Sequence, residues 1–539
     1  MSSLKTLNLS INNLFGSIPP SVGNLINLDT IDVSQNNLSE SIPFTIGNLT
    51  KLRELNFYSN ALTGHIPPSI ENLINLDTIY LNDNELSGPI PFTIGNMTKL
   101  RTLSLFSNSL TGQISPSIGN LINLDIIYLS RNHLSGRPIP STIGNLTKLS
   151  ELTLFLNALT GQIPPSIGNL INLDTIYLSR NHLSGQIPST IGNLTKLSKL
   201  TLYLNALTRQ IPPSIGNLIN LDTIHLAQNN LSGLIPFTIG NMTKLGALSF
   251  YSNAFTGQIP PSICNLINLD IIDLAKNNIS GPIVFAKGNL TKLSTIYFFS
   301  NAFTGQIPPS IGNLINLDTF VLSRNNLSGQ IPSSICNLIN LDTLDLAENN
   351  LSGPIPSIIG NMTKLSTLSL FSYSFTDNIP TEINRLTDLK ELHLYNNNFV
   401  GHLPHNICVS GKLEKFTAAL NQFTGLVPES LKNCSSLERV RLEQNQLTGN
   451  ITDSFGVYPN LDYMDLSDNN FYDHLSPNWG KCKNLTSVKI SSNNLTGSIP
   501  PELGRATNIH ELNLSSNRLT GKNSKGARKL IFVDQTLAK

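Results

Sequence analysis

The chain has 539 residues, 40% of them hydrophobic, and its 35 lysines and arginines nearly balance 34 aspartates and glutamates. This near-neutral charge argues against nucleic acid or an acidic membrane surface as a partner, because both bind through clustered cations. The hydrophobic content is sufficient for a core, which excludes bulk disorder. At roughly 150 residues per domain, the length alone suggests several domains.

Asparagine recurs every 24 residues, and this period replaces the multi-domain interpretation with one repeat array. The series runs from Asn12 to Asn517, with one inserted residue, Arg137, where SGRPIP replaces the SGPIP of neighbouring units. Tyr373 takes the place of asparagine in one unit, and we expect a local irregularity there. The pattern predicts a solenoid of 22 repeats over residues 1–521, followed by a basic tail without repeat character at 522–539.

Each unit reads LxxLxLxxNxLxGxIPxxIGNLxx, and this pattern predicts a short strand followed by a turn. The two leucines of LxL are two positions apart, so their side chains point to the same face of a strand. No unit can bury its apolar positions alone, so the units must stack. The amide of the recurrent asparagine offers donors and acceptors, and we expect it to bridge adjacent coils. The sequence therefore predicts an α/β repeat solenoid with a long parallel sheet.

The consensus LxxLxLxxNxLTGxIPxxIGNL resembles the plant-specific leucine-rich repeat, and the whole chain resembles the ectodomain of a plant leucine-rich repeat receptor-like kinase. Phrases such as NLINLDTIYLSRNHLSG and NLTKLSELTLFLNALTGQIPPSIG resemble the MALE DISCOVERER-interacting branch. The resemblance implies a right-handed superhelix, with the parallel sheet on its concave face and 3₁₀ or loop segments on its convex side. It also implies a location at the extracellular face of the plasma membrane, a secreted peptide ligand, and a leucine-rich repeat co-receptor kinase as a partner.

The sequence lacks several parts that such a receptor would carry. It has no basic-then-apolar signal segment, no paired-cysteine cap, no apolar run of membrane-spanning length and no kinase signature. No HExxH, CxxC, GxSxG or P-loop motif is present either, so neither enzymatic activity nor a cofactor or metal is expected. Two alternatives remain open: a secreted inhibitor of cell-wall enzymes, although such inhibitors resemble much shorter solenoids, and a truncated remnant without function.

Aromatic residues recur two and four positions before the ladder asparagine, on the strand face that the core does not use. This arrangement favours a groove for an extended peptide with rigid aromatic anchors. The alternative is passive copying during repeat duplication, because strands favour aromatic residues in any case. The predicted peptide-binding aromatic and imidazole side chains are Phe155, Tyr177, Tyr203, His225, Tyr251, Tyr297 and Phe299.

Arg439 and Arg441 stand two positions apart in LERVRLEQN, so both project from the same strand face about 7 Å apart. Two guanidinium groups can hold one carboxylate with bidentate geometry. The pair resembles the Arg-x-Arg element with which related peptide-hormone receptors hold the C-terminal carboxylate of the ligand. Pairing with nearby Glu438, Glu443 or Asp465 is the alternative.

The five cysteines predict one disulfide. Cys264 and Cys336 lie three repeats apart, roughly 14 Å at ~4.8 Å per coil, which is too far for a disulfide, and we expect small buried thiols. Cys408 and Cys434 lie on adjacent coils and can form a disulfide, and similar pairs occur in the related receptors. Cys482 is expected to be free.

Eighteen Asn-x-Ser/Thr sequons are present. An asparagine- and threonine-rich repeat generates sequons without selection for glycans, which is the alternative to a glycoprotein. We predict glycans at the sequons within the sequences GNLT and GNMT. These are Asn48, Asn96, Asn145, Asn193, Asn241, Asn289 and Asn361.

Overall fold

The computed structural model describes residues 3–285, 290–372 and 374–520. The chain forms two compact units, residues 1–278 and residues 279–539. The predicted tail at 522–539, the predicted irregularity at Tyr373 and the predicted glycan site at Asn289 lie outside the described residues.

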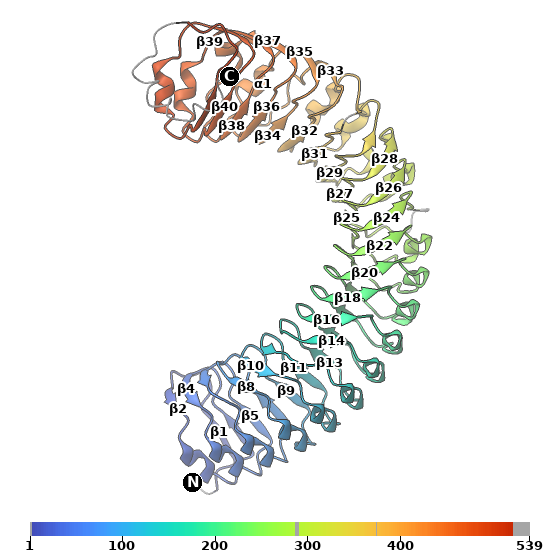
Figure 1. Cartoon of the computed structure of the whole chain (residues 1–539), viewed down its shortest axis with the longest axis vertical. Helices are drawn as coiled ribbons and strands as arrows, with labels where there is room; N and C mark the ends of the chain where they lie inside the picture. Colours follow the sequence, from blue (N-terminus) through green and yellow to red (C-terminus); the bar gives the residue numbers. More distant parts are fainter. Residues whose placement is uncertain (1–2, 286–289, 373, 521–539) are drawn as a thin grey trace. The chain divides into compact units, whose positions relative to one another are not determined.

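Each coil of the first unit opens with a short strand of a long parallel sheet, which the LxL pattern predicts (Figure 1). In β17 (Lys199–Thr201), Leu200 is buried whereas Lys199 is exposed, so the strand has one core face and one outer face. Neighbouring strands pair in parallel at a constant register, with Lys199 opposite Thr223. The other strands of this sheet in the first unit are β1 (Thr6–Asn8), β3 (Thr30–Asp32), β5 (Glu54–Asn56), β7 (Thr78–Tyr80), β9 (Thr102–Ser104), β11 (Ile126–Tyr128), β13 (Glu151–Thr153), β15 (Thr175–Tyr177), β19 (Thr223–His225), β21 (Ala247–Ser249) and β23 (Ile271–Asp273).

The second unit repeats this arrangement with the same register. Leu392 of one strand lies opposite Phe416 of the next, and both are buried. The strands of the long sheet in this unit are β25 (Thr295–Tyr297), β27 (Thr319–Val321), β29 (Thr343–Asp345), β31 (Thr367–Ser369), β32 (Glu391–His393), β34 (Lys415–Thr417), β36 (Arg439–Arg441), β38 (Tyr463–Asp465), β40 (Ser487–Lys489) and β42 (Glu511–Asn513).

After the ladder asparagine, most coils form a second short strand, and these strands build smaller parallel sheets. In the first unit they are β2 (Phe15–Ser17), β4 (Asn37–Ser41), β6 (Ala61–Thr63), β8 (Ser87–Pro89), β10 (Ser109–Gly112), β12 (His133–Leu134), β14 (Thr160–Gln162), β16 (His182–Gly185), β18 (Ala206–Arg209), β20 (Asn230–Gly233) and β22 (Ala254–Gly257). Strand β24 (Asn278–Gly281) begins at the unit boundary, and the second unit adds β26 (Ala302–Gly305), β28 (Asn326–Gly329), β30 (Asn350–Leu351), β33 (Val400–His402), β35 (Gln422–Leu426), β37 (Gln446–Asn450), β39 (Asn470–His474) and β41 (Asn494–Thr496).

The coils close through 3₁₀ segments on the side opposite the long sheet, as predicted. In η7 (Pro165–Asn169), the fixed φ of proline starts the turn, and a glycine follows because a Cβ at Gly168 would lie 2.4 Å from the Thr190 carbonyl oxygen of the next coil. The other 3₁₀ segments of the first unit are η1 (Pro20–Asn24), η2 (Phe44–Asn48), η3 (Pro68–Asn72), η4 (Phe92–Asn96), η5 (Pro116–Asn120), η6 (Ser141–Asn145), η8 (Ser189–Asn193), η9 (Pro213–Asn217), η10 (Phe237–Asn241) and η11 (Pro261–Asn265). The second unit has η12 (Pro309–Asn313), η13 (Ser333–Asn337), η14 (Ser357–Asn361), η15 (Thr381–Arg385), η16 (Pro477–Lys481) and η17 (Pro501–Arg505), and two short α-helices, α1 (Glu429–Lys432) and α2 (Ile451–Ser454).

The ladder asparagines join each coil to the one before it. The side-chain Nδ2 of Asn181 donates to the carbonyl oxygen of Leu154 in the preceding coil at 2.9 Å, and also to the carbonyls of Leu178 and Ser179 in its own turn. Its Oδ1 accepts from the backbone N–H of Leu159, again in the preceding coil, at 3.0 Å. The predicted bridging role is therefore confirmed. The same set of bonds recurs in both units, for example at Asn84, Asn229, Asn349 and Asn493.

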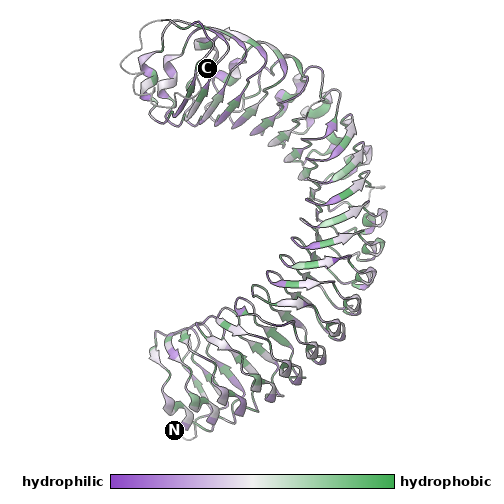
Figure 2. Ribbon diagram, viewed as in Figure 1, coloured by the Kyte–Doolittle hydropathy of each residue, from purple (hydrophilic) through white to green (hydrophobic). Residues whose placement is uncertain are grey.

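The core of each unit is made of the repeated leucine and isoleucine positions, so hydrophobic residues recur in coil after coil (Figure 2). Aromatic residues replace some of them in the second unit, where the rings of Phe375, Phe399 and Phe423 stack at centroid distances of 6.1 and 6.2 Å. Within the described ranges, no helix has both the length and the apolar character that crossing a membrane would require.

The residue inserted at Arg137 is accommodated outside the long sheet. Strands β11 and β13 pair with Ile126 opposite Glu151, so the chain takes 25 residues to reach the next coil instead of 24. The smaller sheets are interrupted at this place, because β12 and β14 belong to different sheets. Only one bridge, between Ser135 and Ala158, connects the two coils there, whereas most neighbouring coils pair through strands. The lining of a surface hollow of about 710 Å³ at this break includes Arg137. The strand face keeps its register across the insertion.

We predict that Asn181→Ala destabilises the first unit. The substitution leaves the Leu159 N–H buried without a partner, at a cost of about 1–3 kcal/mol. It also removes one of two side-chain amide bonds to the Leu154 carbonyl, which keeps its bond from Asn157. Urea denaturation followed by circular dichroism measures the loss, and hydrogen exchange at the Leu159 amide localises it. The control is Asn169→Ala, which removes an exposed asparagine at the end of η7. Equal midpoints for the two variants would contradict a structural role of the ladder amide.

Candidate ligand-binding surface

The predicted aromatic residues of the first unit lie on the outer face of the long sheet. Tyr177 and His225 end their strands, and each is half-buried next to a buried isoleucine. Phe155, Tyr203 and Tyr251 follow their strands by two residues and are also half-buried. Each ring therefore packs one side on the sheet and presents another to solvent, because the core positions are already filled by leucine and isoleucine.

Tyr203 and His225 form the closest pair of the predicted residues in the first unit. Their rings stack at a centroid distance of 4.4 Å with an interplanar angle of 20°. On the preceding coil, the Arg180 guanidinium carbon lies 5.9 Å from the centroid of Tyr203. Burial lowers the pKa of His225, so its imidazole is held in the neutral form more strongly than an exposed one. Arg180, Tyr203 and His225 thus form a continuous cation–aromatic group over three coils.

Cations also lie against Phe155 and Tyr251 of this unit, and the sequence pattern did not predict these contacts. The guanidinium carbon of Arg131 lies 5.8 Å from the Phe155 ring centroid, and Lys276 Nζ lies 5.2 Å from that of Tyr251. Such contacts contribute about 0.5–1 kcal/mol at exposed sites. The signal that could have found these contacts is the position of the cation directly before the ladder asparagine, next to an aromatic residue on the adjacent coil.

An acidic group lies at the end of this aromatic surface within the first unit. Asp273 is in the same row of the sheet as His225 and Ser249, and the three residues are paired in register. Burial raises the pKa of Asp273 to about 6, opposed by hydrogen bonds from the Ala275 N–H and the Ser249 hydroxyl.

In the second unit, Tyr297 and Phe299 lie on the same coil, and their rings meet edge to face at a centroid distance of 6.5 Å. Tyr297 ends β25, and Phe299 follows it by two residues, so both lie on the outer face of the sheet.

Arg439 and Arg441 lie on the outer face of β36 with buried Val440 between them. The guanidinium of Arg439 lies 5.1 Å from the ring centroid of Tyr463 and forms no ion pair with any residue in the described parts of the chain. Arg441 differs: its Nε donates to Glu443 Oε1 at 2.9 Å, and its Nη2 donates to the same oxygen. The alternative of pairing with a nearby carboxylate therefore holds for Arg441 but not for Arg439.

Two other cations near the arginine pair are bound to carboxylates. Lys415, opposite Arg439 on β34, binds Glu391 at 2.7 Å, and Lys489 on β40 binds Glu511 at 2.9 Å. Of the cations Lys415, Arg439 and Lys489 on these neighbouring strands, Arg439 is the one without a bound carboxylate.

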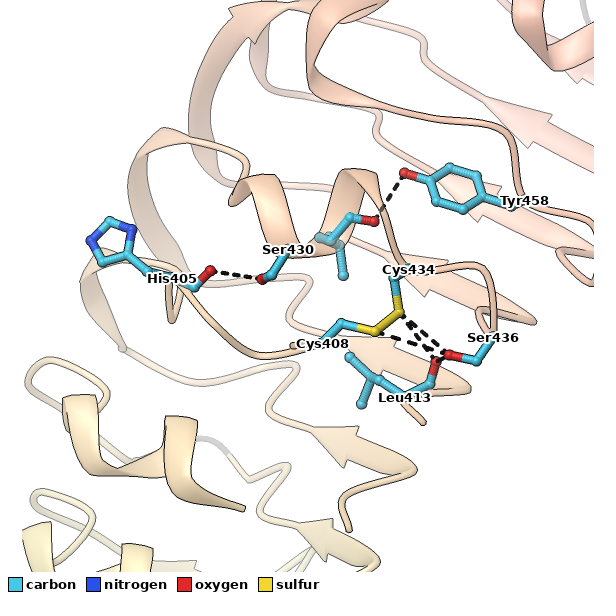
Figure 3. Close-up of a disulfide and its surroundings, with 8 residues drawn as sticks. His405, Cys408, Leu413, Ser430, Cys434, Ser436 and Tyr458 are labelled. Atoms are coloured by element: carbon cyan, nitrogen blue, oxygen red, sulfur yellow. Dashed lines mark hydrogen bonds between the residues drawn. A yellow bond between two sulfur atoms is a disulfide. The ribbon is translucent and has the colours of Figure 1, made fainter. Parts of the chain in front are cut away.

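The disulfide joins Cys408 and Cys434, whose Cα atoms are 5.8 Å apart (Figure 3). Next to it, the Ser436 hydroxyl donates to the Leu413 carbonyl at 2.6 Å, and Ser430 donates to the His405 carbonyl at 2.7 Å. The disulfide thus links adjacent coils of the second unit about one coil before the arginine pair. Cys264, Cys336 and Cys482 lie outside this disulfide, and all three are buried. Burial raises the pKa of Cys336 to about 11, which makes this thiol a poor nucleophile.

The predicted glycan sites in the described ranges are exposed and end their 3₁₀ segments, on the side opposite the long sheet. They are Asn48, Asn96, Asn145, Asn193, Asn241 and Asn361. Glycans at these positions would leave the strand face accessible.

Two family models match the chain. A model described as a leucine-rich repeat region matches residues 298–528. A second model, described as a leucine-rich repeat, matches residues 3–25, 27–49, 51–73, 75–97, 99–121, 172–194 and 220–242. Comparison with curated protein sequences gives no match.

Solved structures of plant receptors are similar to almost the whole chain. The plant peptide hormone receptor RGFR1, solved in complex with RGF2, is 36% identical with a TM-score of 0.93, and the match covers 97% of this chain and 83% of that one. PEPR1, solved with AtPEP1, is 31% identical with a TM-score of 0.87 over 98% and 78%. The Arabidopsis receptor kinase HAESA, solved with the peptide hormone IDA and the co-receptor SERK1, is 33% identical with a TM-score of 0.80 over 96% and 83%.

The repeated strand, asparagine ladder and 3₁₀ closure, together with the family models, define a leucine-rich repeat solenoid. Within this class, the chain belongs to the family of plant leucine-rich repeat receptor-like kinase ectodomains. The predicted family and fold class are thereby confirmed.

We predict that Asp273→Asn makes stability less dependent on pH. Because the pKa of Asp273 is raised, its carboxyl group holds the proton more tightly in the folded chain than in the unfolded chain. The protonated group therefore stabilises the fold fully below pH 3.8, and this stabilisation is lost as the pH rises through about 6. The variant should therefore be more stable than the wild type at pH 7.5, by about 1–2 kcal/mol after discounting for partial exposure, and no more stable at pH 4. Thermal melting at both pH values measures this difference. The control is Asp174→Asn, at an exposed position. If the change in melting temperature between the two pH values is the same in Asp273→Asn as in the wild type, the assignment is contradicted.

Proposed function

We propose that this chain is the ligand-recognition part of a receptor and binds a secreted signalling peptide in extended form on the outer face of the long sheet. The observation that carries the proposal is the exposed arginine of the Arg439–Arg441 pair, whose guanidinium lies against Tyr463 and is bound to no carboxylate of the described residues. RGFR1, PEPR1 and HAESA, which share the fold over nearly the whole chain, were each solved with a peptide.

In the first unit, the aromatic surface suits an extended chain. Phe155, Tyr203 and Tyr251 recur on alternate coils, about 9.6 Å apart at ~4.8 Å per strand, and three residues of an extended peptide also span about 10 Å. A peptide that follows this surface would therefore place an anchoring side chain against an aromatic ring roughly every third residue. Tyr177 and His225 occupy the intervening coils and would contact the residues between these anchors.

In the second unit, Tyr297 and Phe299 offer a further aromatic contact, and the arginine pair would bind the C-terminal carboxylate of the peptide. Arg439 is the primary contact because its guanidinium is exposed and lies against Tyr463. Stacking on a ring fixes the guanidinium plane and leaves its N–H edge free for a bidentate bond. Arg441 is the second contact, and it can take part when its bond to Glu443 is released.

The same proposal includes a partner and a location. HAESA was solved together with the co-receptor SERK1, and we propose that this chain also pairs with a leucine-rich repeat co-receptor kinase at the extracellular face of the plasma membrane. The repeat sequences NLINLDTIYLSRNHLSG and NLTKLSELTLFLNALTGQIPPSIG support assignment to the MALE DISCOVERER-interacting branch. Glycans at the exposed sequons would cover the 3₁₀ side and leave the strand face for the two partners.

We predict that Arg439→Ala/Arg441→Ala weakens binding of a peptide with a free carboxyl terminus by about 10–100-fold, because each charged hydrogen bond contributes about 1.5–3 kcal/mol. A pool of synthetic secreted-peptide candidates, each made as a free acid and as a C-terminal amide, is captured on the immobilised chain and identified by mass spectrometry. Calorimetry then measures the dissociation constants of the captured peptides.

Amidation of the peptide should weaken binding to the wild type about as much as the double substitution does, and should have no further effect on the double variant. Tyr203→Ala should weaken both forms of the peptide equally, because it removes an anchor and not the carboxylate contact. The matched control is Lys199→Ala, an exposed cation on the same sheet face. If neither the double substitution nor amidation of the peptide changes the affinity, the arginine pair is excluded as the carboxylate site.

A further inference from the structure

The side chain of Arg441 is occupied within its own coil. Both of its hydrogen bonds to Glu443, from Nε and from Nη2, go to the single oxygen Oε1. Arg441 and Glu443 are two residues apart, so the strand geometry that points both arginines outward also points this glutamate to the same side. Arg439 has no such intramolecular partner among the residues that the structure describes. The two arginines that the sequence presents as equivalent are therefore in different states.

Glu443 is buried more deeply than a surface ion pair requires. Only 8% of the residue is exposed, and its second oxygen, Oε2, is buried without a hydrogen-bond partner in the described ranges. A buried carboxylate oxygen without a donor is unfavourable for the charged form, because water that solvated it in the unfolded chain is lost. Arg441 and a backbone hydrogen bond stabilise the charged state of Glu443, whereas burial opposes it.

A second buried carboxylate adds to this opposition. Asp465 of β38 lies directly opposite Arg441 in the sheet and is also only 8% exposed. Its Oδ1 accepts from the Ser467 N–H at 3.0 Å, and its Oδ2 accepts from the Tyr463 hydroxyl at 3.3 Å. One guanidinium therefore stands between two carboxylates. Burial raises the pKa of Glu443, the charge of Asp465 raises it further, and the bonds from Arg441 oppose this shift.

The remaining charged and titratable groups come from the neighbouring strands. From β34, Lys415 faces Arg439 and is paired with Glu391, and from β40, Lys489 faces Asp465 and is paired with Glu511. After β32, the Tyr395 ring lies 5.6 Å from the guanidinium carbon of Arg441. Among the residues that the structure describes, Glu443 forms an ion pair with Arg441 alone, so a bound proton is what would release the arginine.

We propose that Glu443 is an internal competitor for the ligand carboxylate, which holds Arg441 while it is ionised and releases it when it is protonated, so that carboxylate binding strengthens as the pH falls. The inference rests on the proposed carboxylate site at Arg439 and Arg441. At neutral pH the ligand carboxylate binds Arg439 and meets two like charges at Arg441. In acid, Glu443 is neutral, one like charge is gone, and the N–H groups of Arg441 turn to the ligand. Glu443 thereby determines whether the site works with one guanidinium or with two.

The first experiment needs no peptide ligand. Phenylglyoxal modifies free guanidinium groups, and mass spectrometry of the segment that contains both arginines gives the ratio of modification at Arg441 to that at Arg439. In the wild type at pH 7.5, Arg441 should be modified at least about five-fold less than Arg439, since a charged hydrogen bond of 1.5 kcal/mol corresponds to roughly ten-fold protection. Glu443→Gln should raise the ratio severalfold, and Glu438→Gln, at an exposed glutamate of the same coil, should leave it unchanged.

Lowering the pH toward 5 should raise the same ratio in the wild type and leave it constant in Glu443→Gln. Using a ratio cancels the dependence of the reagent itself on pH. Equal modification of the two arginines in the wild type, or a ratio that Glu443→Gln does not change, would overturn the proposal whatever the ligand is.

Acetate, as a carboxylate probe, separates this inference from the proposed function. At pH 7.5 acetate should protect Arg439 alone in the wild type and both arginines in Glu443→Gln. If the ratio responds to Glu443→Gln but acetate protects neither arginine in either protein, the carboxylate site itself is wrong and the competitor role is overturned with it. If acetate protects both arginines equally in the wild type, the site exists and Glu443 does not compete.

Discussion

The asparagine amide between coils is the interaction on which the rest of this structure depends. Asn181 donates to a carbonyl and accepts from an N–H of the preceding coil, and it also closes its own turn. A single coil cannot satisfy all of these groups, so the amide is complete only when coils stack at a fixed distance. This requirement sets the register of the long sheet, and the register places every outward side chain in a row with its equivalents on neighbouring coils.

Because the ladder and the buried leucines hold the coils together, the outward strand positions are free to carry recognition. In the first unit these positions hold aromatic rings with cations against them, as in the Arg180–Tyr203–His225 group. Each contact is weak alone, but the rings are half-buried and held by the sheet, so little conformational freedom remains to be lost when a ligand binds. The inserted Arg137 shows the same division of roles, because it interrupts a smaller sheet and leaves the strand face in register.

The period of the sequence was sufficient to predict the strands and the bridging role of the asparagines, because each is a position with one physical task. The contacts among outward side chains could not be predicted in this way. That Arg131 lies against Phe155, or that Arg324 binds Glu348, depends on which rotamer a long side chain adopts over the neighbouring coil. Spacing gives the face and the row of such a residue, whereas its partner is decided by local packing.

The arginine pair illustrates this limit most directly. A two-residue period makes Arg439 and Arg441 equal, and it also brings Glu443 to the same side of the chain as its arginine neighbour. The resemblance to a carboxylate-binding element and the competing ion pair therefore arise from one strand geometry, and no sequence argument could have chosen between them. Burial decides instead: Arg439 remains accessible over Tyr463, while Glu443 holds Arg441 from a buried position that disfavours its own charge. Recognition here can depend on the protonation of one side chain, because the cations Lys415 and Lys489 on the adjacent strands are already bound to carboxylates.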